Sequence, residues 1–452
     1  MVPRASRAAR PGAGGAPVRV PKCRPVPGRS PQQGAAAGAV RTAGGPPITP
    51  TSDAVGRVAA GRTGILGSDV SNPSRTREPL QVTPLRTVQV LGGGSAGSSA
   101  HVRSLASGLV AHGVRVTVCA PDAVERAYDF HGCGARHLPV PRRSDPAAVA
   151  ALRAACTGAD LVHAHGLHAA ARTALALGGR AVPLVVTWHT RAAREGARGT
   201  VNRLLERRAL RAASVVFATS SDLVDTARAR GARDVRLAPL AVPASRPPRA
   251  LGTESKARAE LGAVERPLVM AVGSLVPERG HGLLLDAVAR WRTAGADPLP
   301  LLVVAGEGRE RPALQRRVED EDLPVCFLGR RDDVAELLAA ADVAVLPSRW
   351  ESRSVLAQEA LRIGVPLVAT AVGGVPELVG RAAELVPYGD PAALSDALLR
   401  LLGDPRRRAE LAEAGRAQAA TWPTEDETVG QVLSVYDELA HPHGGRGPRP
   451  GL

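Results

Sequence analysis

The chain of 452 residues contains no apolar run of eighteen residues and only two lysines, Lys22 and Lys256. Since a membrane-spanning helix needs about 20 apolar residues in a row, we expect no span, and the arginine-containing start lacks the apolar core of a secretory signal. Pyridoxal-dependent chemistry needs a Schiff-base lysine, but Lys22 lies in a Gly/Pro-rich segment and Lys256 beside a predicted linker. The five cysteines have no metal-binding spacing, which favours free buried thiols in a reducing cytoplasm.

The net charge of +15 is unevenly distributed. Residues 85–250 carry 23 Lys and Arg against 10 Asp and Glu, whereas residues 251–452 carry 23 against 30. A basic first half predicts an anionic partner or a membrane surface, although arginine-rich composition alone explains the charge equally well. We therefore expect a cytoplasmic protein, with peripheral contact at the inner face of the plasma membrane as the alternative, and no nucleic-acid partner.

The chain divides by composition and periodicity into six parts. Residues 1–84 are rich in Arg, Pro and Gly without sustained periodicity, so we expect a disordered extension. From residue 85, short apolar strands alternate with helical patterns, which predicts parallel sheets covered by helices. The predicted parts are a first αβ domain, a linker, a second αβ domain, a C-terminal helix and a loose tail, at 85–243, 244–264, 265–421, 422–441 and 442–452.

The stretch 347–379 contains the strongest functional signal. A buried strand ends before Pro347, and apolar residues then recur at helical spacing up to Gly364. Ser352 or Ser354 can cap this helix, whose free amides and positive dipole end form an anion site. Glu351 and Glu359 flank that site, and carboxylates there suit hydroxyl groups better than phosphate. Together these features predict a nucleotide-sugar pocket.

This stretch resembles the retaining, GT4-like glycosyltransferases of the GT-B fold. Glu351 and Glu359 have the E-x7-E spacing of that family, and the following GVPLVATAVGGVPELV is similar to its next segment. The resemblance covers about 85–440 and implies an α/β GT-B fold, with two Rossmann-like αβα domains facing across a cleft. It implies that the first domain binds the acceptor and the second the donor, with Glu351 on the sugar and Glu359 on the ribose.

Other motifs resemble the donor-binding segments of the family. Gly97 in AGSSAHV stands where that family brings its backbone to the donor diphosphate. In VGSLVPERG, Arg279 keeps one of two expected cations, whereas Ser274 replaces the other, and Arg353 is a candidate substitute. The remaining donor-binding positions implied are two turn glycines, a base-reading segment and the amides that begin the helix: Gly306, Gly308, Leu328, Arg330, Ser354, Val355 and Leu356.

Three histidines follow predicted parallel strands, at the sheet edge where open αβ folds bind ligands. The resemblance implies that His189 lies near the anomeric centre, so His189 and Glu351 are the predicted catalytic residues. We assign the others, with two nearby arginines, to the acceptor side of the cleft: His163, His165, Arg191 and Arg194. Further arginines at 203, 207 and 211 share one helical face, which is either a solvated surface or a patch for an anionic acceptor or acidic lipids.

The resemblance therefore implies a metal-independent, retaining hexosyltransferase without a cofactor, which uses a UDP- or GDP-sugar and an acceptor of unknown identity. Two alternatives stay open. Gly92, Gly94 and Gly97 match G-x-G-x-x-G, the fingerprint of an NAD(P)- or FAD-dependent enzyme. Ser274, in place of the expected arginine, is compatible with a non-catalytic GT-B-like binding protein.

Overall fold

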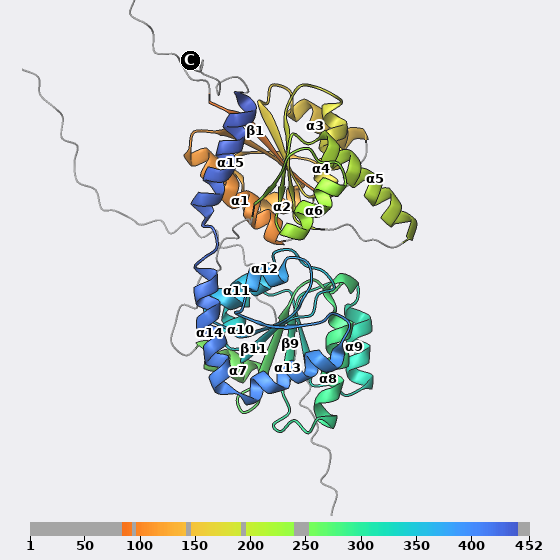
Figure 1. The fold of residues 1–452 in the computed structure, drawn as a ribbon, viewed down its shortest axis with the longest axis vertical. Helices are drawn as coiled ribbons and strands as arrows, with labels where there is room; N and C mark the ends of the chain where they lie inside the picture. The colour runs from red at the N-terminus through yellow and green to blue at the C-terminus, as the bar shows by residue number, and fades with distance from the viewer. Residues whose placement is uncertain (1–83, 93–95, 142–145, 191–195, 239–252, 442–452) are drawn as a thin grey trace, which may run out of the picture. The chain divides into compact units, whose positions relative to one another are not determined.

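The computed structural model describes residues 84–92, 96–141, 146–190, 196–238 and 253–441 (Figure 1). The expected extension up to residue 83, most of the predicted linker and the tail from residue 442 lie outside these ranges. Among the described helices, none is both long and apolar enough to cross a membrane. Three of the four described cysteines are buried and none is in a disulfide; burial raises the pKa of the Cys156 thiol to about 11.

The first half of the chain forms a seven-stranded sheet in the order β3-β2-β1-β4-β5-β6-β7. All its strand pairs are parallel. The central strands are continuous apolar runs because helices cover both faces of such a sheet. Its strands are β1 Arg86–Leu91, β2 Arg115–Ala120, β3 Arg136–Pro139, β4 Leu161–His165, β5 Leu184–Trp188, β6 Val215–Ala218 and β7 Val235–Leu237.

The helices of this half follow the strands in sequence and enclose two apolar clusters, one on each face of the sheet. Leu152, Trp188 and Leu223 belong to one cluster, and Leu105, Leu109 and Phe217 belong to the other. The elements are α1 Ala96–Ala111, α2 Asp122–Tyr128, η1 His131–Cys133, α3 Pro146–Ala155, α4 Leu167–Leu177, α5 Gly196–Ala212 and α6 Ser221–Ala229.

The second half forms a six-stranded sheet in the order β10-β9-β8-β11-β12-β13, with every pair parallel. Its strands are β8 Leu268–Val272, β9 Leu301–Ala305, β10 Val325–Gly329, β11 Val343–Leu346, β12 Leu367–Thr370 and β13 Glu384–Val386. Its helices are α7 Thr253–Leu261, η2 Pro277–Arg279, α8 His281–Thr293, α9 Arg311–Asp320, α10 Val334–Ala339, α11 Val355–Ile363, α12 Val375–Val379, α13 Pro391–Gly403 and α14 Pro405–Ala419. The prediction of two Rossmann-like αβα units is confirmed.

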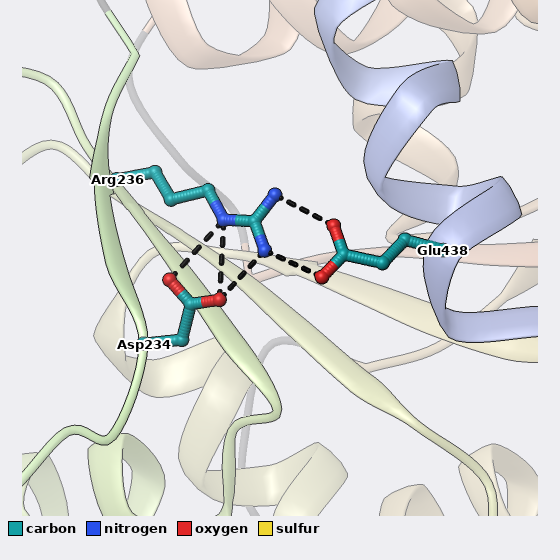
Figure 2. Close-up of polar contacts among 3 residues, drawn as sticks. All are labelled: Asp234, Arg236 and Glu438. Atoms are coloured by element: carbon teal, nitrogen blue, oxygen red, sulfur yellow. Dashed lines mark hydrogen bonds and ion pairs between the residues drawn. The ribbon is translucent and has the colours of Figure 1, made fainter. Parts of the chain in front are cut away.

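The last helix, α15 (Glu425–Ala440), packs on the first sheet rather than on the second. A capping box between Thr424 and Glu427 begins the helix, and Tyr436 is completely buried in the core of the first half. Figure 2 shows the guanidinium of Arg236 in β7 between two carboxylates, with Nη1 2.9 Å from Glu438 of α15 and Nη2 2.7 Å from Asp234. The chain thus returns to its first sheet at its C-terminal end.

Candidate functional site

The second sheet changes direction between β8 and β11. From β8 the chain builds β9 and β10 on one side, and then crosses to the other side to form β11. In open αβ sheets, ligands bind at the carboxyl ends of the strands at such a switch point. The loops at this position are 273–280 after β8 and 347–354 after β11, and they carry Ser274, Arg279 and Glu351.

The start of α11 lies at the end of the second of these loops. Ser354 has extended backbone angles, and its Oγ accepts a hydrogen bond of 3.3 Å from the amide of Ala357, so Ser354 is the N-cap. A cap of this kind satisfies one first-turn amide and leaves those before it available to a ligand. The helix ends at Gly364, which has a positive φ, as the sequence predicts. Val355 is exposed and Leu356 is buried.

Arg279 and Glu351 form an ion pair between Nη1 and Oε2. The Glu351 side chain is 13% exposed and that of Arg279 is 32% exposed, so both are partly removed from water. Burial lowers the pKa of Arg279, which the nearby Glu278 carboxylate opposes. The amide of Gly374 donates to the carbonyl of Glu351 at 2.9 Å and holds this loop against the segment after β12. The predicted phosphate-binding cation and the predicted sugar-binding carboxylate therefore neutralise each other.

Glu359 lies in the second turn of α11 and is 5% exposed. Its Oε1 is 3.6 Å from Nη1 of Arg362, three residues later on the same helix. Sequence reasoning identified Glu359 but missed Arg362, although an i,i+3 pair on a helix is a readable signal. The pair places a cation beside a nearly buried carboxylate.

The turn after β9 carries Gly306 and Gly308. A Cβ on Gly306, where φ is +149°, would overlap the carbonyl oxygen of Gly273, and one on Gly308 would overlap that of Leu275. The amide of Leu275 also donates to the carbonyl of Glu307 at 2.9 Å. Only glycine allows this turn to approach the loop after β8 so closely. Glycine at both positions thus shapes the loop that holds Ser274 and Arg279.

Ser274, which stands where the resemblance implies an arginine, is exposed. Arg353, the candidate substitute, lies directly before the N-cap of α11, with its guanidinium carbon 5.7 Å from the ring centre of Trp422. Burial lowers the pKa of Arg353 to about 10, which leaves it charged at neutral pH. Arg362 lies 5.6 Å from the same indole. Trp422 therefore stacks with two cations near α11, a role that sequence reasoning missed.

Three further residues lie at the carboxyl edge of the second sheet. His281 begins α8 two residues after Arg279; it is 4% exposed, and burial lowers its pKa to about 4. Leu328 and Arg330 lie at the end of β10, with Leu328 partly buried and Arg330 exposed. These placements put the predicted base-reading segment two strands from β8 in the same sheet.

In the first half, four histidines gather at the carboxyl ends of β4 and β5. The ring centres of His163 and His165 are 4.2 Å apart, and that of His101 in α1 is 5.8 Å from His165. His189 follows β5, and its Cε1 would lie 3.3 Å from a Cβ on Gly166. Burial lowers the pKa of His189 to about 4 and lowers that of His165, so neutral imidazoles predominate at neutral pH. Among the described residues, no group of three or more His, Cys, Asp or Glu could hold a metal ion.

His163 is fully buried, and both its ring nitrogens are engaged. Nδ1 is 2.7 Å from the hydroxyl of Tyr436, and Nε2 is 2.7 Å from Oγ1 of Thr187. The amide Nε2 of Gln89 donates to the same tyrosine hydroxyl at 3.0 Å, so this hydroxyl donates its own proton to Nδ1. This places the His163 proton on Nε2. The geometry gives His163 a structural role, joining α15 to the sheet, in place of the acceptor contact expected from sequence.

Of the other predicted residues, some lie outside the described ranges and Gly97 lies close to α11. Arg191, Arg194 and Gly94 lie outside the described residues. Gly97, in the first turn of α1, lies so near α11 that a Cβ there would stand 2.7 Å from Cγ2 of Val355. The structure therefore brings the glycine of the first-half loop beside the start of the E-x7-E helix.

The loop that carries Glu351 also bonds to the segment after β6, which sequence reasoning missed. The hydroxyls of Ser352 and Thr219 are 2.5 Å apart, and Ser352 Oγ donates to Ser220 Oγ at 3.2 Å. Trp350 Nε1 donates to Oδ2 of Asp222 at 3.1 Å. Residues on either side of Glu351 thus hold its backbone in place.

Two family models match the chain. One, described as "Glycosyl transferase 4-like domain", covers residues 96–243, and the other, "Glycosyl transferases group 1", covers residues 266–404. The first match covers α1 to β7, and the second covers β8 to α13. The fold and these matches define a glycosyltransferase of the GT-B type. The chain belongs to the GT4-like, group 1 glycosyltransferase family.

Solved structures with a similar fold include Anabaena HepE in complex with UDP-glucose. That likeness has a TM-score of 0.67 and 22% identity, and covers 78% of this chain and 100% of HepE. WaaG, a glycosyltransferase involved in lipopolysaccharide biosynthesis, has a TM-score of 0.59 and 19% identity, over 80% of this chain and 100% of WaaG. These likenesses establish the GT-B fold.

Curated relatives match part of the chain more closely. The GDP-mannose-dependent monoacylated alpha-(1-6)-phosphatidylinositol monomannoside mannosyltransferase of Corynebacterium glutamicum is 38% identical over 40% of this chain and 50% of its own length. The D-inositol 3-phosphate glycosyltransferase of Thermomonospora curvata is 36% identical over 41% of this chain and 46% of its own length. The chain thus spans about half the length of these curated relatives.

Proposed function

We propose that this protein is a retaining glycosyltransferase that transfers a sugar from a UDP- or GDP-sugar to an acceptor hydroxyl. The observation that supports this most is the ion pair of Arg279 and Glu351, between the loops after β8 and β11 and beside the start of α11. A cation and free amides bind a diphosphate, while a carboxylate binds hydroxyls. Both kinds of group meet at the switch point of one sheet.

Donor binding would separate the ion pair. The diphosphate takes over the guanidinium of Arg279 together with the first amides of α11, near Ser354, Val355 and Leu356. Glu351 is then released to accept hydrogen bonds from the sugar hydroxyls. Glu359, oriented by Arg362, accepts from the ribose. Breaking this one ion pair thus makes Arg279 available to the diphosphate and Glu351 available to the sugar.

In the transfer step, the bond between the anomeric carbon and the diphosphate oxygen breaks, and a bond to the acceptor oxygen forms on the same face. The acceptor hydroxyl gives its proton to the departing diphosphate. Arg279 and the α11 amides stabilise the negative charge that develops there, which is commonly the largest electrostatic contribution. His189 lies near the anomeric carbon as a neutral group, because burial holds its pKa at about 4. The proposed reaction uses no cofactor and no metal.

We infer the acceptor class from the names of two curated relatives. Two of them are named for acceptors that carry phosphate, a phosphatidylinositol mannoside and D-inositol 3-phosphate. We propose an acceptor with an anionic group, bound by the basic first half near His165. Arg191 and Arg194 follow His189 in sequence and are proposed to contact that group.

Hydrolysis or transfer from a panel of UDP- and GDP-sugars tests the proposal. We expect slow turnover of at least one donor by the native chain and its loss in Glu351→Ala. Glu410→Ala, on an exposed face of α14, is the matched control and should keep full turnover. Turnover that persists in Glu351→Ala would remove the proposed site.

The second candidate is a non-catalytic binding protein, favoured by the exposed Ser274 in place of a cation. It predicts thermal stabilisation by a nucleotide-sugar without any turnover. Ser274→Arg separates the two cases, since it should raise donor affinity in both but raise turnover only in an enzyme.

A further inference from the structure

Trp422 lies in the connection between α14 and α15, where it packs against the core of the second half. Its Nε1 donates to the carbonyl of Leu378 in α12 at 3.2 Å, and Nε2 of Gln418 donates to the same carbonyl at 3.2 Å. The next residue is Pro423, and a proline restricts the backbone angles of the residue before it. The indole is therefore held both at its ring nitrogen and through its backbone.

Helix α14 brings this indole to α11 (Figure 1). A Cβ on Gly415 would stand 3.3 Å from the carbonyl oxygen of Leu361, so the two helices approach closely. Beyond this contact the indole meets two guanidinium groups of the α11 segment. The guanidinium carbons of Arg353 and Arg362 are 5.7 Å and 5.6 Å from the ring centre, and both distances are within the range of cation–π attraction.

The two cations are close enough to affect each other. Burial lowers the pKa of Arg353, the Glu377 carboxylate opposes this change, and the charge of Arg362 adds to it. Like charges repel, whereas the face of an indole attracts each of them. Trp422 thus offsets the repulsion between the arginine before the N-cap of α11 and the arginine near its C-terminal end.

Arg362 lies between two neighbours of different chemistry, the indole and the Glu359 carboxylate. Its Nη1 is 3.6 Å from Oε1 of Glu359, which is beyond hydrogen-bond distance. Among the described residues, this buried Nη1 has no hydrogen-bond partner. A guanidinium beside a carboxylate commonly closes to a bidentate pair of about 2.7–2.9 Å. Stacking on the fixed indole accounts for the longer distance.

We propose that Trp422 is a positioning residue of the donor site, which holds Arg362 back from a bidentate pair with Glu359 so that this carboxylate accepts hydrogen bonds from the ribose. This role rests on the proposed function, in which Glu359 binds the ribose. Without the indole, the guanidinium of Arg362 closes on the carboxylate and competes with the ribose hydroxyls for the same oxygens.

Isothermal titration with UDP, GDP and their 2′,3′-dideoxy forms isolates the ribose contact from the rest of the donor. We define the ribose ratio as the dissociation constant of the dideoxy form divided by that of the ribose form. It should be about ten or more in the native chain, because a charged acceptor loses its donors. In Trp422→Leu it should fall to about two, while the dideoxy forms bind as before. Trp422→Phe keeps an aromatic face and should keep most of the ratio.

Variants of Arg362 test the mechanism without removing the indole. Arg362→Lys keeps the charge but loses the planar group that stacks, so it should lower the ribose ratio as Trp422→Leu does. This variant decides the question if Trp422→Leu does not fold. Adding Arg362→Met to Trp422→Leu should restore the ratio to that of Arg362→Met alone, because the competing guanidinium is gone. An indole that acted only through stability would make the double variant weaker still.

Leu314→Ala is the matched control for lost packing. Leu314 is 7% exposed in the other apolar cluster of the second half. Its truncation should lower the melting temperature and leave the ribose ratio unchanged, since the cavity lies away from α11.

Two results would overturn the role of Trp422. One is a native ribose ratio in Trp422→Leu or Arg362→Lys, and the other is an equal fall of the ratio in Leu314→Ala. If the native chain binds neither UDP nor GDP, the proposed function itself fails and this role fails with it. A native chain that discriminates between ribose and dideoxy forms, with variants that do so equally well, removes the role of Trp422 alone.

Discussion

The ion pair between Arg279 and Glu351 predicts opposite effects when either partner is neutralised. Arg279→Gln removes a charge-assisted contact to the diphosphate, which contributes about 1.5–3 kcal/mol. UDP and GDP should therefore bind about ten- to a hundredfold more weakly. Glu351→Gln instead removes the group that competes with the ligand for the guanidinium.

The strength of the Arg279–Glu351 ion pair, and so of this competition, depends on how exposed the two side chains are. The Arg279 side chain is 32% exposed and that of Glu351 is 13% exposed, so the pair is screened by solvent and is worth about 1 kcal/mol. Its removal should tighten UDP or GDP binding about fivefold. Turnover of the complete donor should nevertheless fall, because the sugar hydroxyls exchange a charged carboxylate for the weaker acceptor oxygen of an amide.

Isothermal titration with UDP and GDP, run beside donor turnover, measures both effects. Glu410→Gln is the control for a lost carboxylate, since Glu410 lies on the exposed side of α14. If Glu351→Gln binds either diphosphate tenfold more weakly while its melting temperature is unchanged, the partner exchange on donor binding is refuted.

Three other perturbations have defined outcomes. Tyr436→Phe removes the hydroxyl that bonds both Nε2 of buried Gln89 and Nδ1 of buried His163, and should cost about 1–3 kcal/mol in denaturant unfolding. Glu438→Gln, on the exposed side of α15, should cost under about 1 kcal/mol, and equal costs would contradict the buried network. Burial lowers the pKa of His163 to about 3, so its contribution to stability is complete above the unfolded value near 6.5 and is lost as the pH falls toward 3. Between these two pKa values the free energy of unfolding should rise by about 1.4 kcal/mol per pH unit because of this residue. His163→Gln should remove this rise and leave the pH dependence above pH 7 unchanged. Arg353→Ala should weaken donor binding about tenfold; an unchanged affinity would exclude Arg353 as the substitute for the missing arginine.

The sequence alone determined the alternation of strands and helices and the E-x7-E segment. Buried parallel strands are continuous apolar runs such as β8 and β11, and the cap and glycine stop of α11 are local signals, so both were readable without a partner. The pattern did not identify α4, an alanine-rich helix whose polar residues Arg172 and Thr173 are themselves buried, or β3, a short edge strand that is not apolar throughout. Local signals fail where polar residues lie inside the core or where an element is half exposed.

Only the tertiary structure decided which residues meet. Arg279 and Glu351 are separated by more than seventy positions, and their pairing depends on β8 and β11 being neighbours at the point where the sheet reverses. The same holds for His163, which looked like a ligand-facing residue at a strand end until α15 returned to cover it with Tyr436. Periodicity reports how each segment divides between core and solvent. It contains no information about which distant segment supplies the other half of a buried contact, because that is set by strand order and by the path of the chain between the sheets.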